Sequence, residues 1–260
     1  MKTKLSKLYS DPELAKFYEV NDHDRLDYET ILELAKDARS VLDIGCGTGV
    51  LSAALSINSD VTAVDPARAM LEIAKRNFDQ TNVEWIEGDA REVRLARKFD
   101  FIVMSGHAFQ VFLDEQDQLS VLKTIAEHLA DCGTFIFDSR NPFFPESKER
   151  TRQQTYRKFQ HSKLGEVHMW NESSFDEESG ILTYTNGFSA LGERDEKSAQ
   201  ERIKYTPKSE LDDLLSKAGL EILSCFGSWN KEPFHNQARE IIIVGGLEKH
   251  HNTKHDNERS

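Results

Sequence analysis

Residues 41–49, VLDIGCGTG, constrain the fold of this 260-residue chain more than any other segment. Val41, Leu42 and Ile44 are typical of a short buried strand, and three glycines at alternate positions then interrupt it. Glycine permits positive φ angles and lets a ligand approach the backbone where a Cβ atom would intrude. Residues 50–57 indicate a helix directly afterwards, whose first backbone amides would face a ligand above the turn. The segment therefore predicts a strand, turn and helix that bind a nucleotide-like ligand.

The spacing of these glycines differs from that of two phosphate-binding loops. A dinucleotide fingerprint requires G-x-G-x-x-G, whereas the third glycine here comes one residue earlier and Val50 takes its place. A P-loop ends in Gly-Lys-Ser/Thr, and no lysine lies near. The remaining pattern, G-x-G-x-G preceded by Asp43, resembles motif I of the class I S-adenosylmethionine-dependent methyltransferases. The resemblance implies that Gly45, Cys46 and Gly47 contact S-adenosylmethionine, and that Asp43 helps to orient its ammonium end.

An acidic residue follows the next predicted strand, residues 61–64. Asp65 lies about twenty residues beyond the glycines, where a carboxylate can accept hydrogen bonds from both hydroxyls of a ribose. Asp65 is also a candidate N-cap for a helix over residues 66–78, and the two roles are compatible. The resemblance adds Pro66 and Met70 to the cofactor site, with Met70 beside the adenine. Packing in the core is the alternative for Met70.

A third acidic residue follows the predicted strand at residues 83–86. Gly88, Asp89 and Ala90 resemble the adenine-recognition motif of the family, in which the acid accepts from the exocyclic amine and the next amide donates to a ring nitrogen. A Gly-Asp turn alone is common. Its position after the glycine turn and Asp65, each at the end of a strand, favours the methyltransferase resemblance over a dinucleotide-binding fold.

The fourth predicted strand, residues 99–104, leads to polar residues. In the family this strand end lies beside the reactive methyl group, which implies that Ser105 and Gly106 contact the cofactor. His107 and Gln110 are then the polar groups placed to meet a substrate. His107 is a candidate general base because the ordinary pKa of imidazole lies near neutrality. The alternative is that His107 bonds to the backbone and shapes the pocket.

A helix over residues 115–130 and a fifth strand over 134–137 follow. The helix is expected to end near Gly133, as a C′ glycine would end it. The strand delivers a polar cluster to the same edge of the sheet, and Arg140 and Asn141 are candidates for substrate contact. An ordinary polar loop is the alternative.

The N-terminal segment, residues 1–38, is predicted to be helical. In the resembling family such helices lie over the cofactor, with an aromatic residue near their end. Tyr18 and Arg25 match that arrangement, Arg25 toward the methionine carboxylate. The alternative reading is that Tyr18 packs in the core and Arg25 is solvated.

From residue 143 the pattern changes to segments rich in β-branched and aromatic residues, separated by turn signals. Their partial alternation predicts an antiparallel sheet with one face covered. Six aromatic residues are expected on that face: Tyr156, Phe159, Trp170, Phe175, Tyr184 and Phe188. In small-molecule members of the family, an insertion at this point serves as a substrate lid or a dimerisation sheet.

The end of the chain returns to the first pattern. Thr206 and Pro207 predict a helix start, with Thr206 as the N-cap, and Gly219 predicts its end. Strands at 220–226 and 240–245 resemble the closing hairpin of the family, whose last strand is antiparallel. We therefore predict an α/β fold with a Rossmann-like, seven-stranded, mostly parallel sheet and a small antiparallel β insertion.

The predicted division of the chain has four parts: an N-terminal helical cap (1–38), a cofactor-binding domain (39–142 and 206–247), the β insertion (143–205) and a disordered tail (248–260). The tail is charged and lacks periodicity. Its three histidines, His250, His251 and His255, are read as solvated, and no metal site is predicted.

Composition restricts the partners. The chain has 33 basic and 45 acidic residues and a formal net charge of -12, which disfavours a nucleic acid as substrate. Three scattered cysteines imply neither a disulfide framework nor a metal knuckle. No apolar run reaches membrane-spanning length and residues 1–10 lack the apolar core of a signal peptide, so a soluble cytoplasmic protein is expected.

These patterns together predict an enzyme that transfers a methyl group from S-adenosylmethionine to a small molecule and releases S-adenosylhomocysteine. Nitrogen is slightly favoured over oxygen as the acceptor. In place of the Asn/Asp-Pro-Pro-Tyr/Phe element of base-modifying relatives, residues 105–108 read Ser-Gly-His-Ala. Two alternatives are a methyltransferase acting on protein or RNA and a non-catalytic cofactor-binding subunit. A homodimer formed through the β insertion is a further expectation.

Overall fold

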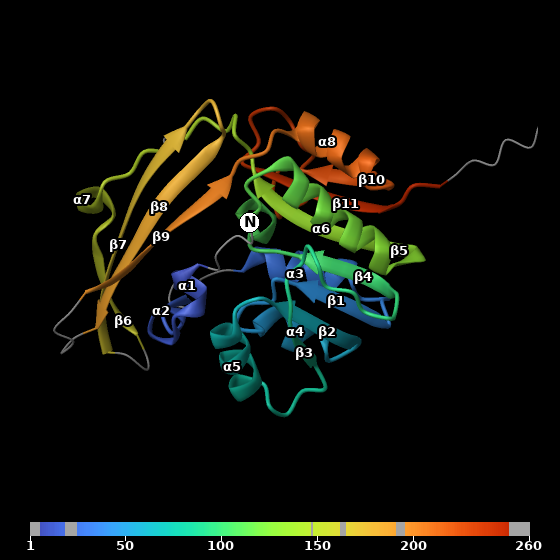
Figure 1. Cartoon of the computed structure of the whole chain (residues 1–260), viewed down its shortest axis with the longest axis horizontal. Helices are drawn as coiled ribbons and strands as arrows, with labels where there is room; N and C mark the ends of the chain where they lie inside the picture. Colours follow the sequence, from blue (N-terminus) through green and yellow to red (C-terminus); the bar gives the residue numbers. More distant parts are fainter. Residues whose placement is uncertain (1–5, 19–24, 147, 162–164, 191–195, 250–260) are drawn as a thin grey trace, which may run out of the picture.

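The computed structural model describes residues 6–18, 25–146, 148–161, 165–190 and 196–249. Two β-sheets dominate these residues, and two short N-terminal helices lie between them (Figure 1). The predicted tail lies outside the described residues except for its first two positions, and so do His250, His251 and His255. No helix among the described residues is long and apolar enough to cross a membrane.

The larger sheet has seven strands in the order β10-β11-β5-β4-β1-β2-β3. Their bounds are Ser40–Ile44 (β1), Asp60–Asp65 (β2), Glu84–Glu87 (β3), Phe99–Met104 (β4), Leu129–Arg140 (β5), Leu220–Phe226 (β10) and Glu240–Leu247 (β11). Strands β1 to β5 pair in parallel, and β11 pairs antiparallel with both of its neighbours. This arrangement confirms the predicted Rossmann-like fold with an antiparallel last strand.

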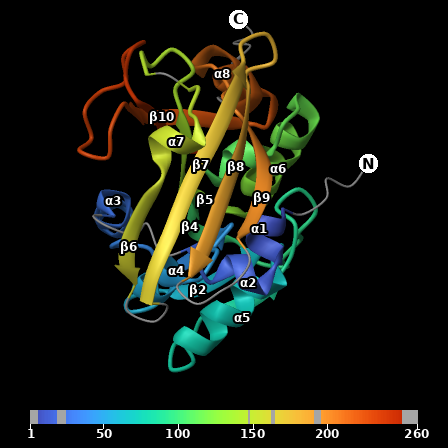
Figure 2. The same cartoon turned by 90° about the vertical axis from the view of Figure 1, so that its left-hand side faces the viewer.

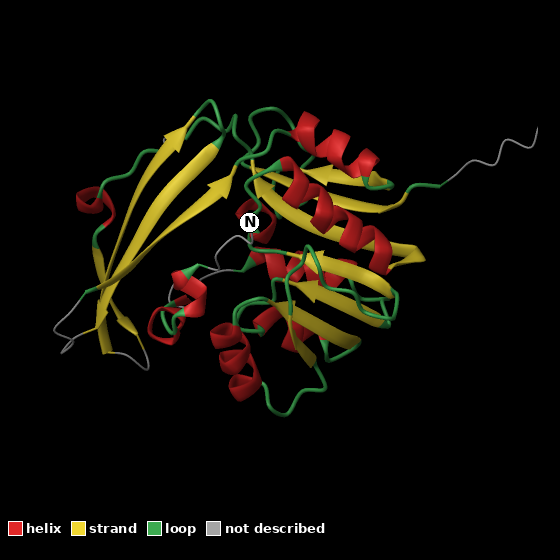
Figure 3. Cartoon of the chain, in the orientation of Figure 1, coloured by secondary structure: helices red, strands yellow, loops and turns green. Residues whose placement is uncertain are grey.

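Alternating side chains let helices cover both faces of this sheet (Figure 3). Leu42 and Ile102 pack in one cluster with α6 and α8, whereas Val41 and Val103 pack in another with α3 and α4. The helix bounds are Leu26–Leu34 (α3), Val50–Leu55 (α4), Arg68–Asn77 (α5), Glu115–His128 (α6) and Lys208–Lys217 (α8). Burial on both faces explains why the strands read as continuous apolar runs.

The second sheet is antiparallel, in the order β6-β7-β8-β9, and it lies in front of the larger sheet in Figure 2. Its strands are Arg157–His161 (β6), Gly165–Asp176 (β7), Ile181–Ala190 (β8) and Lys197–Lys204 (β9), and a short helix, Arg152–Thr155 (α7), precedes them. The predicted antiparallel insertion is therefore present. One of the six aromatic residues expected on its covered face, Tyr156, is 45% exposed, so it does not belong to that face.

Two short N-terminal helices, Lys7–Ser10 (α1) and Pro12–Ala15 (α2), pack against the second sheet. Phe17, which follows α2, is fully buried and stacks on Phe188 of β8 with a ring-centroid distance of 4.9 Å. Leu14 and Val167 belong to the same cluster. The N-terminal segment is thus anchored to the insertion, which lies far from it in the sequence.

Two sequence predictions about helix ends are wrong. Pro207, rather than Thr206, is the N-cap of α8, and the Thr206 hydroxyl accepts a hydrogen bond from Gln118 Nε2 at 2.8 Å instead. Gly133 does not end α6, because the chain passes into β5 at Leu129. A Cβ atom at Gly133 would lie 2.8 Å from the carbonyl oxygen of Phe99, so this glycine permits close approach of β4 rather than a positive φ.

The contact between the N-terminal segment and the second sheet should contribute strongly to stability. Replacing Phe17 by Ala removes a fully buried ring, and we expect the free energy of unfolding to fall by about 3–5 kcal/mol. Ile57→Ala is the control because Ile57 is 79% exposed, and its effect should stay within about 0.5 kcal/mol. Urea unfolding followed by circular dichroism measures both. Equal effects of the two substitutions would contradict the packing role of Phe17.

Candidate functional site

A cavity of about 1200 Å³ lies between the ends of the parallel strands, the N-terminal helices and the second sheet. Among the residues that line it are Gly45, Gly47, Asp65, Asp89, Gly106 and His107. Single small-molecule sites usually occupy about 300–1,000 Å³. The cavity therefore has room for a cofactor and a second molecule together.

The turn after β1 has the backbone geometry that its glycines suggest. Gly45, Gly47 and Gly49 all have positive φ angles, at 78°, 55° and 83°. A Cβ atom on Gly49 would lie 2.4 Å from the Trp85 ring, so a larger residue could not fit there. A Cβ atom on Gly47 would lie 3.6 Å from the ring of Tyr18, which covers the turn from the N-terminal segment. Tyr18 also lines the cavity, as the resemblance implies.

Asp65 occupies the end of β2 and connects two turns. One carboxylate oxygen accepts from the amide of Gly47 and the other from the amide of Ala67, both at 2.8 Å. Burial raises the pKa of Asp65, and these two amide hydrogen bonds oppose that effect. Each oxygen keeps a lone pair for a hydroxyl group. Pro66 and Met70 lie beside it in the cavity wall, and α5 begins later than predicted, with Ala67 as its N-cap.

Asp89, after β3, is held by an ion pair that the sequence did not indicate. Arg91 Nη2 donates to Asp89 at 2.5 Å, and Arg91 Nη1 donates to Asp117 of α6 at 2.6 Å. These hydrogen bonds raise the pKa of Arg91, the bond to Asp89 most strongly. Gly88, Asp89 and Ala90 all line the cavity. A donor group of a ligand at Asp89 would therefore share the carboxylate with Arg91.

Three residues expected at the cofactor are not in the cavity wall. Arg25 forms an ion pair with Asp27 and stacks 3.8 Å above the Tyr28 ring centroid. Asp43 is buried and accepts from the Ser52 hydroxyl at 2.5 Å, and burial raises its pKa to about 7. Burial also raises the pKa of the Cys46 thiol. Direct contact of these three side chains with a ligand is therefore not supported. Asp43 instead packs the start of α4 against β1.

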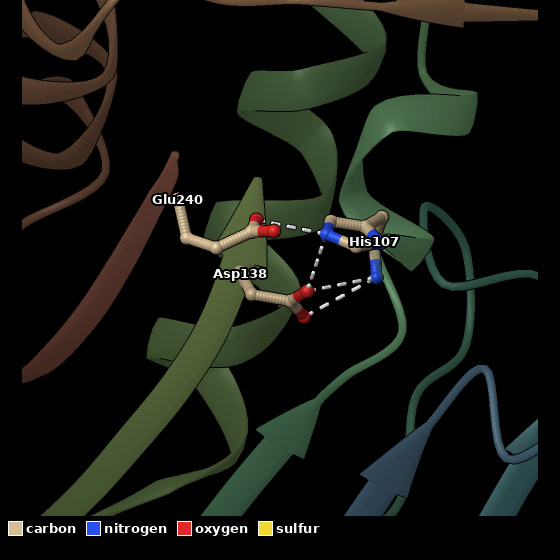
Figure 4. Close-up of side chains that lie close together, drawn as sticks. All are labelled: His107, Asp138 and Glu240. Atoms are coloured by element: carbon tan, nitrogen blue, oxygen red, sulfur yellow. Dashed lines mark hydrogen bonds and ion pairs between the residues drawn. The ribbon is translucent and has the colours of Figure 1, made fainter. Parts of the chain in front are cut away.

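His107 lines the cavity, and its imidazole ring contacts the carboxylates of Asp138 and Glu240 (Figure 4). Its Nε2 lies 2.9 Å from Glu240 Oε2 and 3.2 Å from Asp138 Oδ2, and its backbone amide donates to the Asp138 carboxylate at 3.1 Å. The residue has a φ of 61°, a conformation that non-glycine residues adopt rarely. Asp138 and Glu240 thus fix the ring from behind, while Ser105 and Gly106 precede it in the cavity wall.

The cluster brings one imidazole nitrogen close to two carboxylates. Asp138 is buried at the end of β5; burial raises the pKa of its carboxyl, and the positive charge of His107 opposes that effect. The imidazole nitrogen and the two carboxylate oxygens lie within 4.8 Å of one another, a spacing that would also suit a metal ion. An ion at this position would have to displace the hydrogen bonds between His107 and the two carboxylates.

Three residues proposed for substrate contact have different surroundings. Gln110 is fully buried outside the cavity wall, where its amide donates to the carbonyl of Lys204 and accepts from Arg140. Asn141 reaches the wall, but its amide donates to the carbonyls of Asn236 and Ala238. Gln110 is therefore a positioning residue, contrary to the prediction, and Asn141 holds the adjacent loop. Arg140 also lines the cavity, and its Nη1 donates to Gln110 at 3.3 Å.

Several residues of this site escaped sequence reasoning. Glu240 follows His107 by 133 positions, and Arg91 and Asp117 meet only after α6 has packed on the sheet. The basic side chains of the second sheet also line the cavity. The sequence contains one signal for the contact between His107 and Glu240. Glu240 is the first residue of the last strand, and a buried acidic residue needs a hydrogen-bonding or charged partner.

Comparisons with known proteins find related sequences and a related structure. A family model described as "Methyltransferase domain" matches residues 41–133. A cypemycin N-terminal methyltransferase from Streptomyces sp is 30% identical over 212 residues, which cover 80% of this chain and 83% of that protein. A malonyl-[acyl-carrier protein] O-methyltransferase from Acetivibrio thermocellus is 39% identical over 83 residues, covering 31% of this chain and 29% of that protein.

A solved structure shares the fold. The S-adenosylmethionine-dependent methyltransferase from Clostridium acetobutylicum ATCC 824 has a TM-score of 0.77 and 18% sequence identity. The likeness covers 91% of this chain and 97% of that chain. It therefore extends over both sheets.

The position of Asp65 leads to a prediction about cofactor affinity. Asp65→Ala removes the acceptor for the Gly47 and Ala67 amides and for a ribose hydroxyl, and we expect S-adenosylhomocysteine to bind about tenfold or more weakly. Asp60→Ala is the matched control, since Asp60 is exposed at the other end of β2. Isothermal titration calorimetry measures both. An affinity within about twofold of the unmodified protein would rule out the proposed role of Asp65.

The buried carboxyl of Asp43 predicts a pH effect on stability. Its pKa of about 7 in the folded protein exceeds the ordinary value near 3.9, so the folded state binds the proton more tightly than the unfolded chain. This contribution to the free energy of unfolding is full below about pH 4 and is lost as the pH rises toward 7. Between pH 5 and 8 the free energy of unfolding of the unmodified protein should therefore fall by roughly 3 kcal/mol more than that of the Asp43→Asn variant.

Urea unfolding at pH 5 and pH 8 tests this expectation. Asp60→Asn is the control, because it makes the same chemical change at an exposed position of β2. Parallel pH profiles for the unmodified protein and Asp43→Asn would show that Asp43 does not titrate as described.

Proposed function

Because the chain belongs to the class I S-adenosylmethionine-dependent methyltransferases, we propose that it methylates an amine nitrogen of a small molecule, with His107 as general base. The observation that carries the proposal is the orientation of His107. Its Nε2 faces two carboxylates, while its Nδ1 has no hydrogen-bond partner in the part of the chain that the structure describes. An Nε2–H donated to Glu240 leaves the lone pair on Nδ1 to accept a proton.

The residues around the cavity fit the cofactor. Gly45 and Gly47 of the turn line the cavity, and Asp65 keeps lone pairs for a ribose diol. When bound, S-adenosylmethionine supplies an electrophilic methyl group on a sulfonium. Strand order then separates the two ligands, since Asp65 and Asp89 lie on one side of β1 and His107 on the other. We infer that the acceptor occupies the part of the cavity near β4 and β5.

The acceptor must reach the methyl carbon in line, about 3–3.5 Å away, with water excluded. Residues of the second sheet and of the N-terminal segment also line the cavity. An amine is protonated near neutral pH and must lose a proton before it can attack. His107 accepts that proton, and the carboxylates of Asp138 and Glu240 stabilise the imidazolium that forms.

Two observations support nitrogen and a small acceptor. The relative that matches this chain over most of its length is an N-terminal methyltransferase, and the free group of a chain N-terminus is an amine. The net charge of -12 argues against a phosphate backbone as acceptor. Oxygen is the alternative supported by the O-methyltransferase relative. A macromolecular acceptor and a non-catalytic subunit remain the other candidates.

His107 variants test the base. We expect His107→Ala to lower kcat about a hundredfold, within the range for loss of a general base, with the affinity for S-adenosylhomocysteine unchanged. His235→Ala, at an exposed histidine outside the cavity, is the control. Glu240→Gln should give a smaller loss of kcat, because the ring keeps its position and loses only stabilisation of its charge. Equal losses in kcat and in cofactor affinity would indicate a structural role.

The acceptor class is tested separately, by incubating the protein with methyl-tritiated S-adenosylmethionine and cell extract and then sizing the labelled product. Label in the small-molecule fraction, in amine-containing products, is expected. Label on protein or RNA would contradict a small acceptor, and cofactor binding without turnover would favour the non-catalytic subunit.

A further inference from the structure

The wall of the cavity around the acceptor position is basic, although the chain as a whole is acidic. Outside the cofactor side, six basic residues and two acidic residues of the described chain line the cavity. The six are Arg140, Lys148, Arg150, Arg157, Arg202 and Arg239. The acidic pair, Glu146 and Glu201, is outnumbered there, whereas acidic residues exceed basic ones by 45 to 33 in the whole sequence. This reversal points to a ligand that carries negative charge.

Arg140 is the best-placed of these cations. It ends β5, two residues after Asp138, and is half-buried. No carboxylate among the described residues lies within 4.0 Å of its guanidinium, and its Nη1 donates only to the amide oxygen of Gln110 at 3.3 Å. A cation withdrawn from water without a counter-ion is unfavourable unless a ligand supplies the anion. Its planar group can donate two parallel hydrogen bonds to a carboxylate or phosphate.

Lys148 and Tyr205 line the same cavity as Arg140. The Lys148 ammonium donates to the carbonyl of Pro142 at 2.9 Å and lies 5.8 Å from the Tyr205 ring centroid, with no carboxylate of the described chain within 4.0 Å. The Tyr205 hydroxyl has no hydrogen-bond partner among the described residues. Burial raises the pKa of Tyr205 and the charge of Arg140 opposes this, so the phenol stays neutral and can donate. Three donors therefore line one cavity, and no carboxylate of the described residues lies within 4.0 Å of the Arg140 or Lys148 side chain.

We propose that Arg140, Lys148 and Tyr205 form a subsite for an anionic group, a carboxylate or a phosphate, on the methyl acceptor. This proposal rests on the proposed function. The strand order places the subsite on the acceptor side, because β5 and β2 are separated by β4 and β1. Gln110, three residues after His107, binds both Arg140 and the carbonyl of Lys204. It thereby fixes the distance from the anion subsite to the proposed base.

Direct binding of anions tests the subsite without knowledge of the acceptor. Inorganic phosphate and acetate are titrated separately into the protein saturated with S-adenosylhomocysteine, and binding is followed by calorimetry. At least one anion should bind saturably, and Arg140→Gln should weaken that binding about tenfold or more. Arg140→Lys should give an intermediate loss, since it keeps the charge without the planar fork. The anion that binds more tightly identifies the chemical source.

Lys217→Gln is the matched control, because Lys217 pairs with Glu115 on the exposed surface of α8 and should leave anion affinity unchanged. Retained affinity of each variant for S-adenosylhomocysteine shows that the variant is folded. Lys148→Met provides a second variant and should also weaken the binding of the anion. Absence of saturable binding by both anions, or equal binding by the unmodified protein and Arg140→Gln, would overturn the proposal.

Turnover provides an independent arm. Each amine acceptor is compared with its neutral counterpart: an amino acid with its amide, and an aminosugar phosphate with the free aminosugar. The acidic member should have the higher kcat/KM by about tenfold or more, and Arg140→Gln should remove most of that preference. Methylation of amines without preference for the acidic member would overturn the anion subsite while leaving the proposed function intact. Failure to bind the cofactor would instead overturn the proposed function.

Discussion

The carboxylate of Asp65 holds together the edge of the sheet on which the site is built. Its two oxygens accept from the amides of Gly47 and Ala67, and so bind the turn after β1 to the turn after β2. Both turns lie where parallel strands end, which is where open α/β sheets bind ligands. The glycines let the backbone pass close beneath a ligand, and Asp65 fixes that backbone in place. The same carboxylate supports the turn and retains acceptors for the cofactor.

The proposed cofactor half of the site was accessible to sequence reasoning because its sequence signals are local. The strand that precedes Gly45 and the strand that ends in Asp65 are each recognisable from a short apolar run. The glycine turn directly follows the first run, and Asp65 directly follows the second. The fold followed from the same alternation of strands and helices. Asp43 shows the limit of this reasoning, since the sequence places it beside the glycines but does not show that its side chain points to Ser52.

The acceptor half depends on contacts between distant segments, which no local pattern encodes. His107 was identified as a candidate base, but the carboxylate of Glu240 that orients it follows 133 residues later. Gln110 looked like a ligand contact because it follows His107, whereas packing directs its amide to β9 and Arg140. Gly133 was read as the end of a helix, although its missing side chain accommodates a neighbouring strand. In each case the sequence indicated that the residue was important, but it did not show which neighbours the residue would contact.

The anchoring of α1 and α2 on the second sheet has a consequence for the order of events at the site. Tyr18 covers the glycine turn, while Phe17 beside it stacks on Phe188 of the second sheet. A ligand that moved Tyr18 away from the turn would therefore also disturb the packing of Phe17 on this sheet, other residues of which line the cavity. Two molecules that each changed the position of this segment would alter one another's affinity by the same factor.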